Sequence, residues 1–278
     1  MGLDSLLQEY EVKRKQLYEE YKKNMKIGAL LAIVLVGFYF LFKASVIASN
    51  YRKTVKENII KDIVKDKYPD GTYNHRDRIS QHYINSLNFY QRPDRHSGED
   101  LITGSFNGVT FKASDIHMEE RVETRDSKGN VQVSYQTIFK GRWYHFEFER
   151  EFEHVLQVKE GRFVGAAARN LKKYETESIL FNKKFKVFSS DQSYVFYQLT
   201  PVLLEKILEL EGMHRGSLQL MYHKNCLDIA VNDSSDSFEI KLKTPLVKES
   251  IAHIIGDIDM PAAIINEFNL DSEKFKKK

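Results

Sequence analysis

The chain has 278 residues, of which 42% are hydrophobic and 29% are charged, ordinary values for a folded globular protein. Eighteen Phe and 15 Tyr, beside only 5 Pro and 14 Gly, exclude a disordered chain and favour packed strands. The single cysteine, Cys226, excludes an intramolecular disulfide and a zinc site built from several cysteines.

The net charge of +3 is unevenly distributed along the chain. Residues 51–92 carry nine basic and five acidic side chains, whereas residues 93–278 carry 26 basic and 29 acidic ones. A domain that binds a polyanion would concentrate basic side chains in its larger folded part. We therefore do not expect nucleic acid as a partner.

Residues 1–26 form a charged segment with the pattern of an amphipathic helix. A heptad-like seam runs along it, with positions separated by alternating spacings of four and three residues. Such a seam favours self-association through residues 3–24, and the alternative is a solvated helix that leads into a membrane. The seam consists of Leu3, Leu7, Tyr10, Arg14, Leu17 and Tyr21.

Residues 27–48 predict a transmembrane helix. Ile27 to Phe42 lack any charge, and at about 1.5 Å per residue they would cover about 24 Å of a hydrocarbon core about 30 Å thick. Continuation through Lys43 to Ala48 extends the helix to about 33 Å, with the lysine near one end of the span. A buried core helix and a signal peptide are the alternatives. The expected location is the cell membrane, crossed once.

Basic side chains flank this predicted span on both sides in nearly equal number. The positive-inside rule therefore does not decide which side of the membrane the rest of the chain faces. The residues expected to flank the membrane are Lys26, Lys43, Arg52, Lys53 and Lys56.

Residues 49–278 predict a soluble α+β domain with curved antiparallel sheet and packed helices, in which two subdomains could meet near residues 160–178. An amphipathic helix over 51–67 opens it. Side chains then alternate with a period of two, as in strands, around Asn107-Gly108 and over residues 131–148, with a bend at Gly141.

Further along, Thr200 and Pro201 predict the start of a helix, because they combine an N-cap residue with a first-turn proline. We expect strands over 185–187, 218–222, 227–231 and 238–242, and one or two helices within 246–268, divided near 256–261.

Several stretches resemble a bacterial membrane protein family described as domain of unknown function 3137. The quoted stretches are Asp100-Leu-Ile-Thr-Gly104, Ile138-Phe-Lys-Gly-Arg142, Ile179 to Gln192 and Leu199 to Lys206, and the similarity extends from about Tyr51 to Leu242. The resemblance implies N-terminal membrane spans followed by an α+β domain. Many members carry two spans, which would place the domain in the cytoplasm. This chain shows one span, and the resemblance favours the cytoplasmic side for its soluble domain. No activity is established for the family, so the resemblance implies an architecture alone.

Motifs that carry chemistry are absent. The chain contains no Gly-x-Gly-x-x-Gly, no phosphate-binding loop, no Gly-x-Ser-x-Gly and no His-Glu-x-x-His. Asp115 and His117 fit a solvated strand face better than a ligand pair, and Asp257 and Asp259 fit helix caps better than a cation site. Cys226 fits inert packing. We predict no catalytic residue, no metal and no cofactor.

The polar pair that is the strongest candidate for a functional role is Asp191-Gln192, directly before an aromatic segment. Its structural interpretation is a turn in which the aspartate accepts hydrogen bonds from nearby backbone amides. Its functional interpretation is a recognition surface formed with Tyr194 and Tyr197, where the family usually has a more basic segment.

The sequence therefore favours a non-enzymatic interaction or scaffolding domain tethered to the cell membrane. Its expected partners are the lipid bilayer and other proteins. A membrane-tethered hydrolase or transferase with a site assembled by folding, and a ligand- or lipid-sensing domain, are the alternatives.

Overall fold

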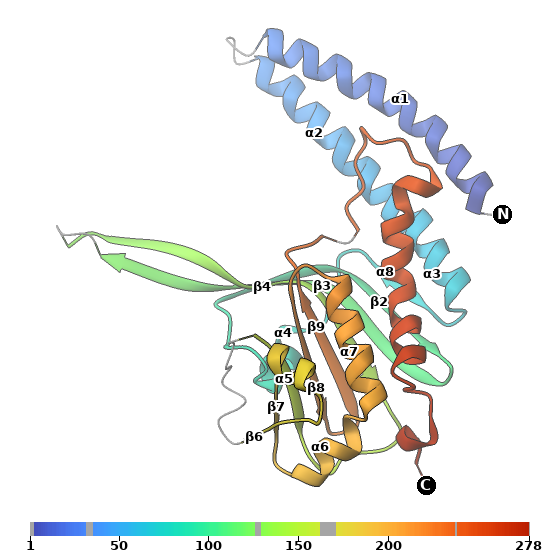
Figure 1. The fold of residues 1–278 in the computed structure, drawn as a ribbon. Coiled ribbons are helices and arrows are strands. Elements are labelled where there is room, and N and C mark those ends of the chain that lie inside the picture. The colour runs from blue at the N-terminus through green and yellow to red at the C-terminus, as the bar shows by residue number, and fades with distance from the viewer. Residues whose placement is uncertain (1–2, 32–35, 126–128, 162–170, 237, 278) are drawn as a thin grey trace. The chain divides into compact units, whose positions relative to one another are not determined.

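The computed structural model describes residues 3–31, 36–125, 129–161, 171–236 and 238–277. The chain forms two compact units (Figure 1). Unit 1 comprises Met1–His75 and Ser237–Asp259, and unit 2 comprises Arg76–Asp236 and Met260–Lys278. The predicted division into 1–26, 27–48 and 49–278 stays a prediction.

Unit 1 is built on a hairpin of two long antiparallel helices, α1 and α2. Lys43 Nζ of α2 lies 3.3 Å from Glu20 Oε1 of α1, and a side chain at Gly28 would touch Leu41. The remaining elements are a π-helical turn, two helices and a short strand. The bounds in unit 1 are α1 (Leu3–Leu30), α2 (Val36–Val55), the π-helical turn (Lys56–Ile60), α3 (Lys61–Lys67), β1 (Thr72–Asn74) and the first part of α8 (Lys248–Glu267).

The predicted heptad-like seam is the packing face of α1. Leu7 and Arg14 are buried, and the seam continues to Asn24 and Gly28, which are also buried. Arg14 pairs with Glu11 at 2.7 Å and donates from Nη1 to a backbone carbonyl of residue 242 at 2.9 Å, which accounts for a charged side chain in this position. Self-association through residues 3–24 would require a face that α1 already uses inside unit 1.

The single transmembrane helix predicted over residues 27–48 is not supported. Among the residues that the structure describes, no helix combines the length and the apolar character needed to cross a membrane. The apolar stretch is divided instead, because α1 ends at Leu30 and α2 begins at Val36. Each helix then continues into charged sequence, so neither carries an apolar run of sufficient length.

The amphipathic helix predicted over 51–67 is confirmed as the end of α2, the π-helical turn and α3. Its apolar stripe is buried, from Val55 through Ile59 and Ile60 to Val64. The strand predicted over 238–242 is wrong, because the described part of that segment has no strand. A single helix, α8, runs through Pro261 where one or two had been expected.

Unit 2 is an α+β fold with a curved, unclosed antiparallel sheet (Figure 1). Its strands lie in the order β2-β3-β4-β9-β8-β5-β7-β6. The predicted hairpins at 107–108 and between 222 and 227 are confirmed. The strands are β2 (Arg95–Phe106), β3 (Val109–Arg125), β4 (Val131–Glu147), β5 (Leu156–Glu160), β6 (Lys172–Tyr174), β7 (Phe185–Ser189), β8 (Ser217–His223) and β9 (Cys226–Asn232), and the helices are α4 (Gln81–Leu87), α5 (Ile179–Lys184), α6 (Gln192–Gln198), α7 (Pro201–Met213), the end of α8 and a 3₁₀ helix (Glu273–Phe275).

Successive side chains of a strand point to opposite faces of the sheet, so the sheet of unit 2 has two distinct faces. On the α4 face, Trp143, Met221 and Ala230 pack in one apolar cluster with Ile84 and Leu87 of α4. The opposite face carries buried side chains of the intervening positions, such as Tyr144, Tyr222 and Leu227.

Two features predicted from the sequence account for where helix α7 begins and where strand β4 bends. Thr200 caps α7, since its side chain accepts from the Leu203 amide at 3.4 Å, and Pro201 follows in the first turn. Gly141 has φ +154°, and a side chain there would collide with the backbone of Val231 on β9. Only glycine fits this close approach.

Candidate functional site

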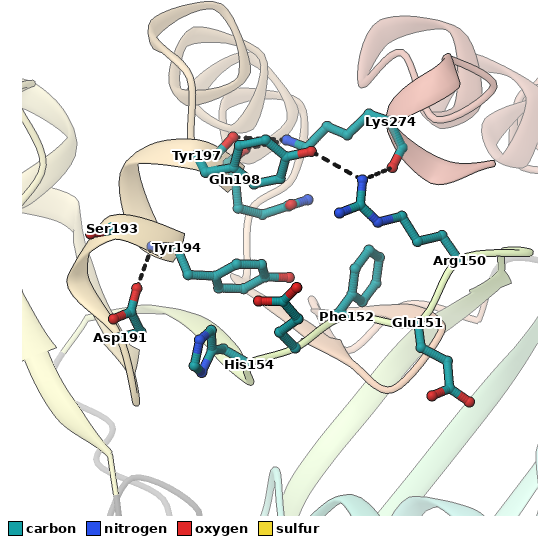
Figure 2. Close-up of a pocket in the computed structure, with 11 residues that line it drawn as sticks. Arg150, Glu151, Phe152, His154, Asp191, Ser193, Tyr194, Tyr197, Gln198 and Lys274 are labelled. Carbon is teal, nitrogen blue, oxygen red and sulfur yellow. Dashed lines mark hydrogen bonds between the residues drawn. The ribbon is translucent and has the colours of Figure 1, made fainter. Parts of the chain in front are cut away.

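The predicted recognition residues lie at a pocket of about 280 Å³ in unit 2 (Figure 2). Asp191, Tyr194 and Tyr197 line it, and the exposed Gln192 does not. The other walls come from the segment 150–154 after β4, from Ser193 and Gln198, and from Lys274 in the 3₁₀ helix. Folding thus joins segments that are far apart in the chain.

Helix α6 positions the aromatic side chains of the pocket. Asp191 is its N-cap, with Oδ1 accepting from the Tyr194 amide at 2.7 Å, as the turn interpretation predicts. Residues three and four apart share one side of a helix, so Tyr194, Tyr197 and Gln198 face the pocket together. Tyr194 is buried, and Tyr197 is 49% exposed.

Two cations meet at the end of α6. Arg150 Nη1 lies 3.4 Å from both the Tyr197 hydroxyl and the Lys274 carbonyl oxygen. Lys274 Nζ donates to the carbonyls of Tyr197 at 2.9 Å and Gln198 at 3.3 Å, which are groups that the helix end leaves unpaired. Burial lowers the pKa of Lys274 to about 8, and the neighbouring guanidinium of Arg150 adds to this shift.

Two buried side chains in the pocket wall are incompletely hydrogen-bonded. The Tyr194 hydroxyl forms no hydrogen bond within the described residues, and the Gln198 amide has only the Tyr222 hydroxyl beside it, a contact that opposes the rise in the Tyr222 pKa. Gln198 is completely buried, and burial raises the pKa of the Tyr194 hydroxyl. Leaving such a group unpaired reduces the folding free energy by about 1–3 kcal/mol. A bound ligand that supplies the missing hydrogen bonds would account for this arrangement.

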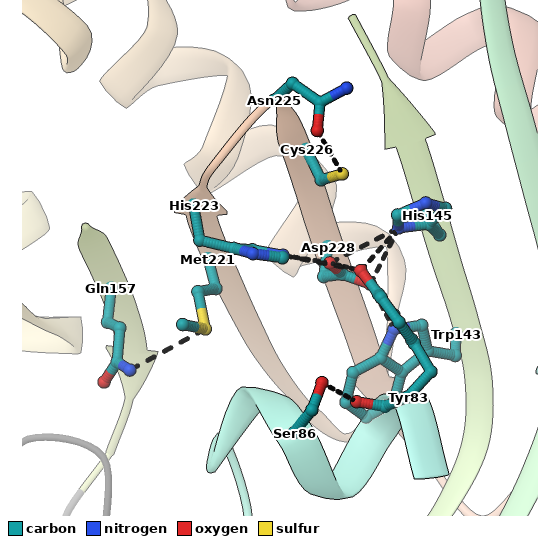
Figure 3. Close-up of polar contacts among 10 residues, drawn as sticks. All are labelled: Tyr83, Ser86, Trp143, His145, Gln157, Met221, His223, Asn225, Cys226 and Asp228. Atoms are coloured by element: carbon teal, nitrogen blue, oxygen red, sulfur yellow. Dashed lines mark hydrogen bonds and ion pairs between the residues drawn. The ribbon is translucent and has the colours of Figure 1, made fainter. Parts of the chain in front are cut away.

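A second polar cluster, centred on Asp228, lies on the α4 face and was missed by the sequence analysis (Figure 3). Its carboxylate is completely buried and receives Trp143 Nε1 at 2.8 Å, the Tyr83 hydroxyl at 2.7 Å and His223 Nε2 at 2.8 Å. His145 Nδ1 lies 3.3 Å from Oδ1, because His145 on β4 and Asp228 on β9 are direct cross-strand partners.

The charges in the Asp228 cluster compensate each other. Burial opposes ionisation of Asp228, but hydrogen bonds from His145 and His223 hold the pKa of this carboxyl well below its usual range. Burial likewise opposes the charged form of His145, yet hydrogen bonds to Asp228 and Cys226 raise its pKa to about 9. An imidazolium therefore faces a carboxylate at neutral pH.

A thiol, an imidazole and a carboxylate together are the residue types of a nucleophilic triad. Here they are closed off, with Cys226 7%, His145 6% and Asp228 0% exposed. This burial fits the inert packing predicted for Cys226. The residues could have been found only through their positions on the buried face of neighbouring strands, and that requires the strand order.

The other acidic and histidine candidates have separate partners. Asp115 Oδ1 pairs with Arg142 Nη1 at 3.0 Å, whereas His117 Nε2 lies 3.0 Å from Thr137 Oγ1. Asp257 and Asp259 lie inside α8, so the cap predicted for them is wrong, and Asp259 pairs with a lysine of α3 at 2.8 Å.

One group of carboxylates in unit 2 has the spacing of a cation site. Oxygen atoms of Glu99, Asp100 and Asp236 lie within 4.8 Å of one another. Arg142 lies beside them and donates to the Asp100 carbonyl at 3.2 Å. Its positive charge is close to the position that a cation would take.

The residues predicted to flank a membrane lie along the hairpin of unit 1. Lys26, Lys43, Arg52 and Lys53 are exposed, and Lys56 is buried. Lys43 pairs with Glu20 and Lys53 lies 3.9 Å from Glu57.

The end of the hairpin where α1 stops and α2 begins exposes large apolar side chains, here called the hairpin tip and defined as Leu30, Phe38, Tyr39 and Phe42. They are 81%, 61%, 63% and 68% exposed, respectively. Exposed apolar groups that gather in one place mark interaction surfaces, whereas scattered ones do not.

Comparison with known proteins supports the resemblance seen in the sequence. The model of a family described as "Protein of unknown function (DUF3137)" matches residues 137–270, so the predicted resemblance is confirmed over this part of the chain. No curated protein matches the chain. The crystal structure of the mycobacterial trehalose monomycolate transport factor A is similar at 7% identity with a TM-score of 0.42, covering 75% of this chain and 93% of that chain. A likeness this weak carries no argument about this chain.

Proposed function

We propose that this protein is a non-enzymatic interaction protein whose hairpin tip attaches to the surface of an anionic membrane. Unit 2 would then present a binding surface to other proteins or ligands at that membrane. The observation that carries the proposal is the combination of exposed apolar side chains with the exposed basic side chains Lys23 and Lys26 at one end of the hairpin.

The apolar part of this argument rests on exposure. Phe38 and Phe42 lie four residues apart and therefore project from the same side of α2, and Leu30 ends α1 next to them in the hairpin. Burying one such side chain completely releases about 1.5–3 kcal/mol. Two or three of them at a bilayer interface suffice for reversible attachment of the kind that amphipathic helices make.

The electrostatic part rests on a gap in the acidic residues. No Asp or Glu lies between Glu20 and Glu57, and the part of the hairpin next to the tip carries Lys22, Lys23, Lys26 and Lys43. Lys22 and Lys43 pair with Glu19 and Glu20, whereas Lys23 and Lys26 are exposed. Each basic side chain near an anionic leaflet contributes about 1 kcal/mol. A membrane with anionic lipid is therefore the partner whose charge and apolar interior both complement this end of the hairpin.

A non-enzymatic role is supported by the closure of the Asp228 cluster. This cluster has the residue types of a catalytic centre, but Asp228 and its imidazole partners are buried beneath α4. Saturated hydrogen bonding around a buried carboxylate is typical of a structural core.

Vesicle flotation of the full chain tests the membrane proposal. We expect flotation with vesicles that contain phosphatidylserine and much less with pure phosphatidylcholine. Phe38→Ser with Phe42→Ser should weaken binding at least tenfold, since about 1.4 kcal/mol corresponds to a factor of ten. Lys23→Glu with Lys26→Glu should abolish the preference for anionic lipid.

The matched control replaces two equally exposed apolar residues of another helix, Ile179→Ser with Leu180→Ser, which are 73% and 68% exposed. This variant should float like the unchanged protein. Equal flotation of the Phe38/Phe42 variant would contradict the proposal. A tip that instead mediates contact between two copies would show as a dimer by light scattering that the same two serines dissociate.

A further inference from the structure

We propose that the pocket formed by segment 150–154, α6 and Lys274 binds a monoanionic carboxylate that carries an aromatic body, with Arg150 and Lys274 as the groups that hold the carboxylate. This site lies in unit 2 and does not depend on membrane attachment. Three observations carry the proposal.

The first observation is a pair of cations without a counter-ion. Arg150 contacts the hydroxyl of Tyr197 and Lys274 contacts its backbone carbonyl, and within the described residues neither cation forms an ion pair with a carboxylate. Their hydrogen-bond partners are neutral carbonyl and hydroxyl oxygens. Two like charges held together in a partly buried wall repel each other, and a bound anion removes that repulsion.

The second observation is the hydrogen-bonding capacity left over in the same wall. The buried Tyr194 hydroxyl has no partner among the described residues, and the buried Gln198 amide, whose neighbour is the Tyr222 hydroxyl, can still accept and donate further hydrogen bonds. Buried polar groups of folded proteins are normally paired. Figure 2 shows the Gln198 side chain extending between the two tyrosines towards Arg150, so one ligand group at the guanidinium would also be near the amide.

The third observation is the aromatic lining. Tyr194 and Tyr197 have ring centroids 6.4 Å apart, and Phe152 lies in the same pocket and packs on Tyr222 at 5.6 Å. Aromatic side chains that surround a few convergent polar groups are typical of small-molecule sites. An aromatic or similarly flat apolar body would pack against these rings.

The acidic residues of the pocket restrict the charge of the ligand. Glu151, Glu153 and Asp191 also line it, and Asp191 is engaged in capping α6. Two cations against three carboxylates do not suit a phosphate, which carries nearly two negative charges at neutral pH. A single carboxylate brings less negative charge into this pocket than a phosphate does, and Arg150 and Lys274 are the cations that would hold it.

The ionisation of Lys274 gives the site a pH dependence. The groups that face its ammonium are Arg150 and the carbonyls at the end of α6, and burial together with Arg150 lowers its pKa to about 8. The protonated form is the one that attracts a carboxylate. Affinity should therefore be constant below pH 7 and fall as the pH rises through 8.

The experiment is calorimetric titration of the full chain with N-acetylphenylalanine, its neutral amide and phenyl phosphate. We expect the acid to bind at least tenfold more tightly than either of the others. Two peptides ending in phenylalanine, one with a free and one with an amidated carboxyl end, show whether the natural carboxylate belongs to a polypeptide terminus or to a free small acid. Binding of the free-ended peptide assigns the site to a polypeptide terminus, and exclusion of both peptides assigns it to a free small acid.

Arg150→Gln and Lys274→Gln should each weaken binding of the acid at least tenfold. Lys183→Gln, which changes an exposed lysine of α5, is the matched control and should bind normally. Because Lys274 also pairs with the end of α6, Tyr197→Phe provides a milder variant, for which we expect a threefold to fivefold loss. Equal affinity for the acid and its amide, tighter binding of phenyl phosphate, or an unchanged affinity in Arg150→Gln would overturn the proposal.

Discussion

The Asp228 cluster and the pocket at Arg150 are both polar groupings of unit 2, but they differ in how charge is compensated. Around Asp228 a buried carboxylate is surrounded by an imidazolium, a second imidazole, an indole and a phenol, all at hydrogen-bond distance. At the pocket, two cations lie together with carbonyl oxygens as partners, and the neighbouring Tyr194 hydroxyl has no partner among the described residues.

This difference separates a structural role from a binding role. A saturated buried network stabilises the fold only as long as every member is present, whereas groups left uncompensated at a pocket do not improve stability. We expect substitutions in the Asp228 cluster to affect folding and substitutions at Arg150 to affect ligand binding.

The largest effect is expected for Asp228→Ala. Removing the carboxylate leaves the His145 imidazolium buried without its partner, and breaking a buried pair in this way costs about 3–5 kcal/mol of unfolding free energy. Urea unfolding followed by circular dichroism measures the loss. Asp236→Ala, at an exposed position, should change the unfolding free energy by less than about 0.5 kcal/mol. Similar small effects of both substitutions would mean that the cluster is not a stabilising network.

The second prediction concerns pH. The pKa of His145 is raised to about 9 in the folded protein, against about 6.5 in an unfolded chain, so its contribution is fully present below pH 6.5 and is lost as the pH rises through 9. The lowered pKa of Asp228 acts oppositely, with its contribution present above about pH 4 and lost at more acidic pH. Unfolding free energy should thus decline between pH 6.5 and 9, by an amount on the order of 2 kcal/mol.

Unfolding of His145→Gln over the same pH range is the matching measurement. This variant should show a flatter curve between pH 6.5 and 9, because the titrating imidazole is gone. An equally steep decline in both proteins would assign the pH dependence to other groups.

The two clusters also show what could be predicted from the sequence. Alternating side chains predicted the hairpins of unit 2, and a cap followed by proline predicted α7, because these signals are local. The partners of Asp228 are spread over α4, β4 and β8, so finding them requires the strand register. Asp191, Tyr194 and Tyr197 could be found because they lie in one short helix and its cap, whereas Arg150 and Lys274 are distant in sequence.

The hairpin of unit 1 shows a different limit of prediction. Hydropathy reports how apolar residues 27–48 are, but it does not report where the chain reverses. The seam of α1, which continues to Asn24 and Gly28, is buried where α1 packs against α2. A polar asparagine and a small glycine on that seam are compatible with a close helix pair, and this long-range contact replaced the single helix that the local pattern favoured.

A smaller effect is expected for Tyr83→Phe. The hydroxyl donates to Asp228 at 2.7 Å, and a hydrogen bond to a charged acceptor contributes about 1.5–3 kcal/mol. The aromatic ring remains and keeps its packing against the His145 ring, whose centroid lies 4.9 Å away. We therefore expect a loss near 1.5 kcal/mol in urea unfolding. Tyr39→Phe, at a position that is 63% exposed, should have no measurable effect. An unchanged stability of Tyr83→Phe would show that α4 does not depend on this contact.

The smallest effect on stability is expected for Arg150→Gln. The substitution removes two hydrogen bonds of 3.4 Å, which are long and weak, and it also removes the repulsion between Arg150 and Lys274. These contributions oppose each other, so the unfolding free energy should change by less than about 0.5 kcal/mol. The pKa of Lys274 should rise at the same time, because one of the two causes that lower it is gone, and this is measurable by NMR titration of its side chain. A loss above about 1.5 kcal/mol would place Arg150 in the same class as Asp228, as a structural group, and would remove the contrast on which the proposed carboxylate site depends.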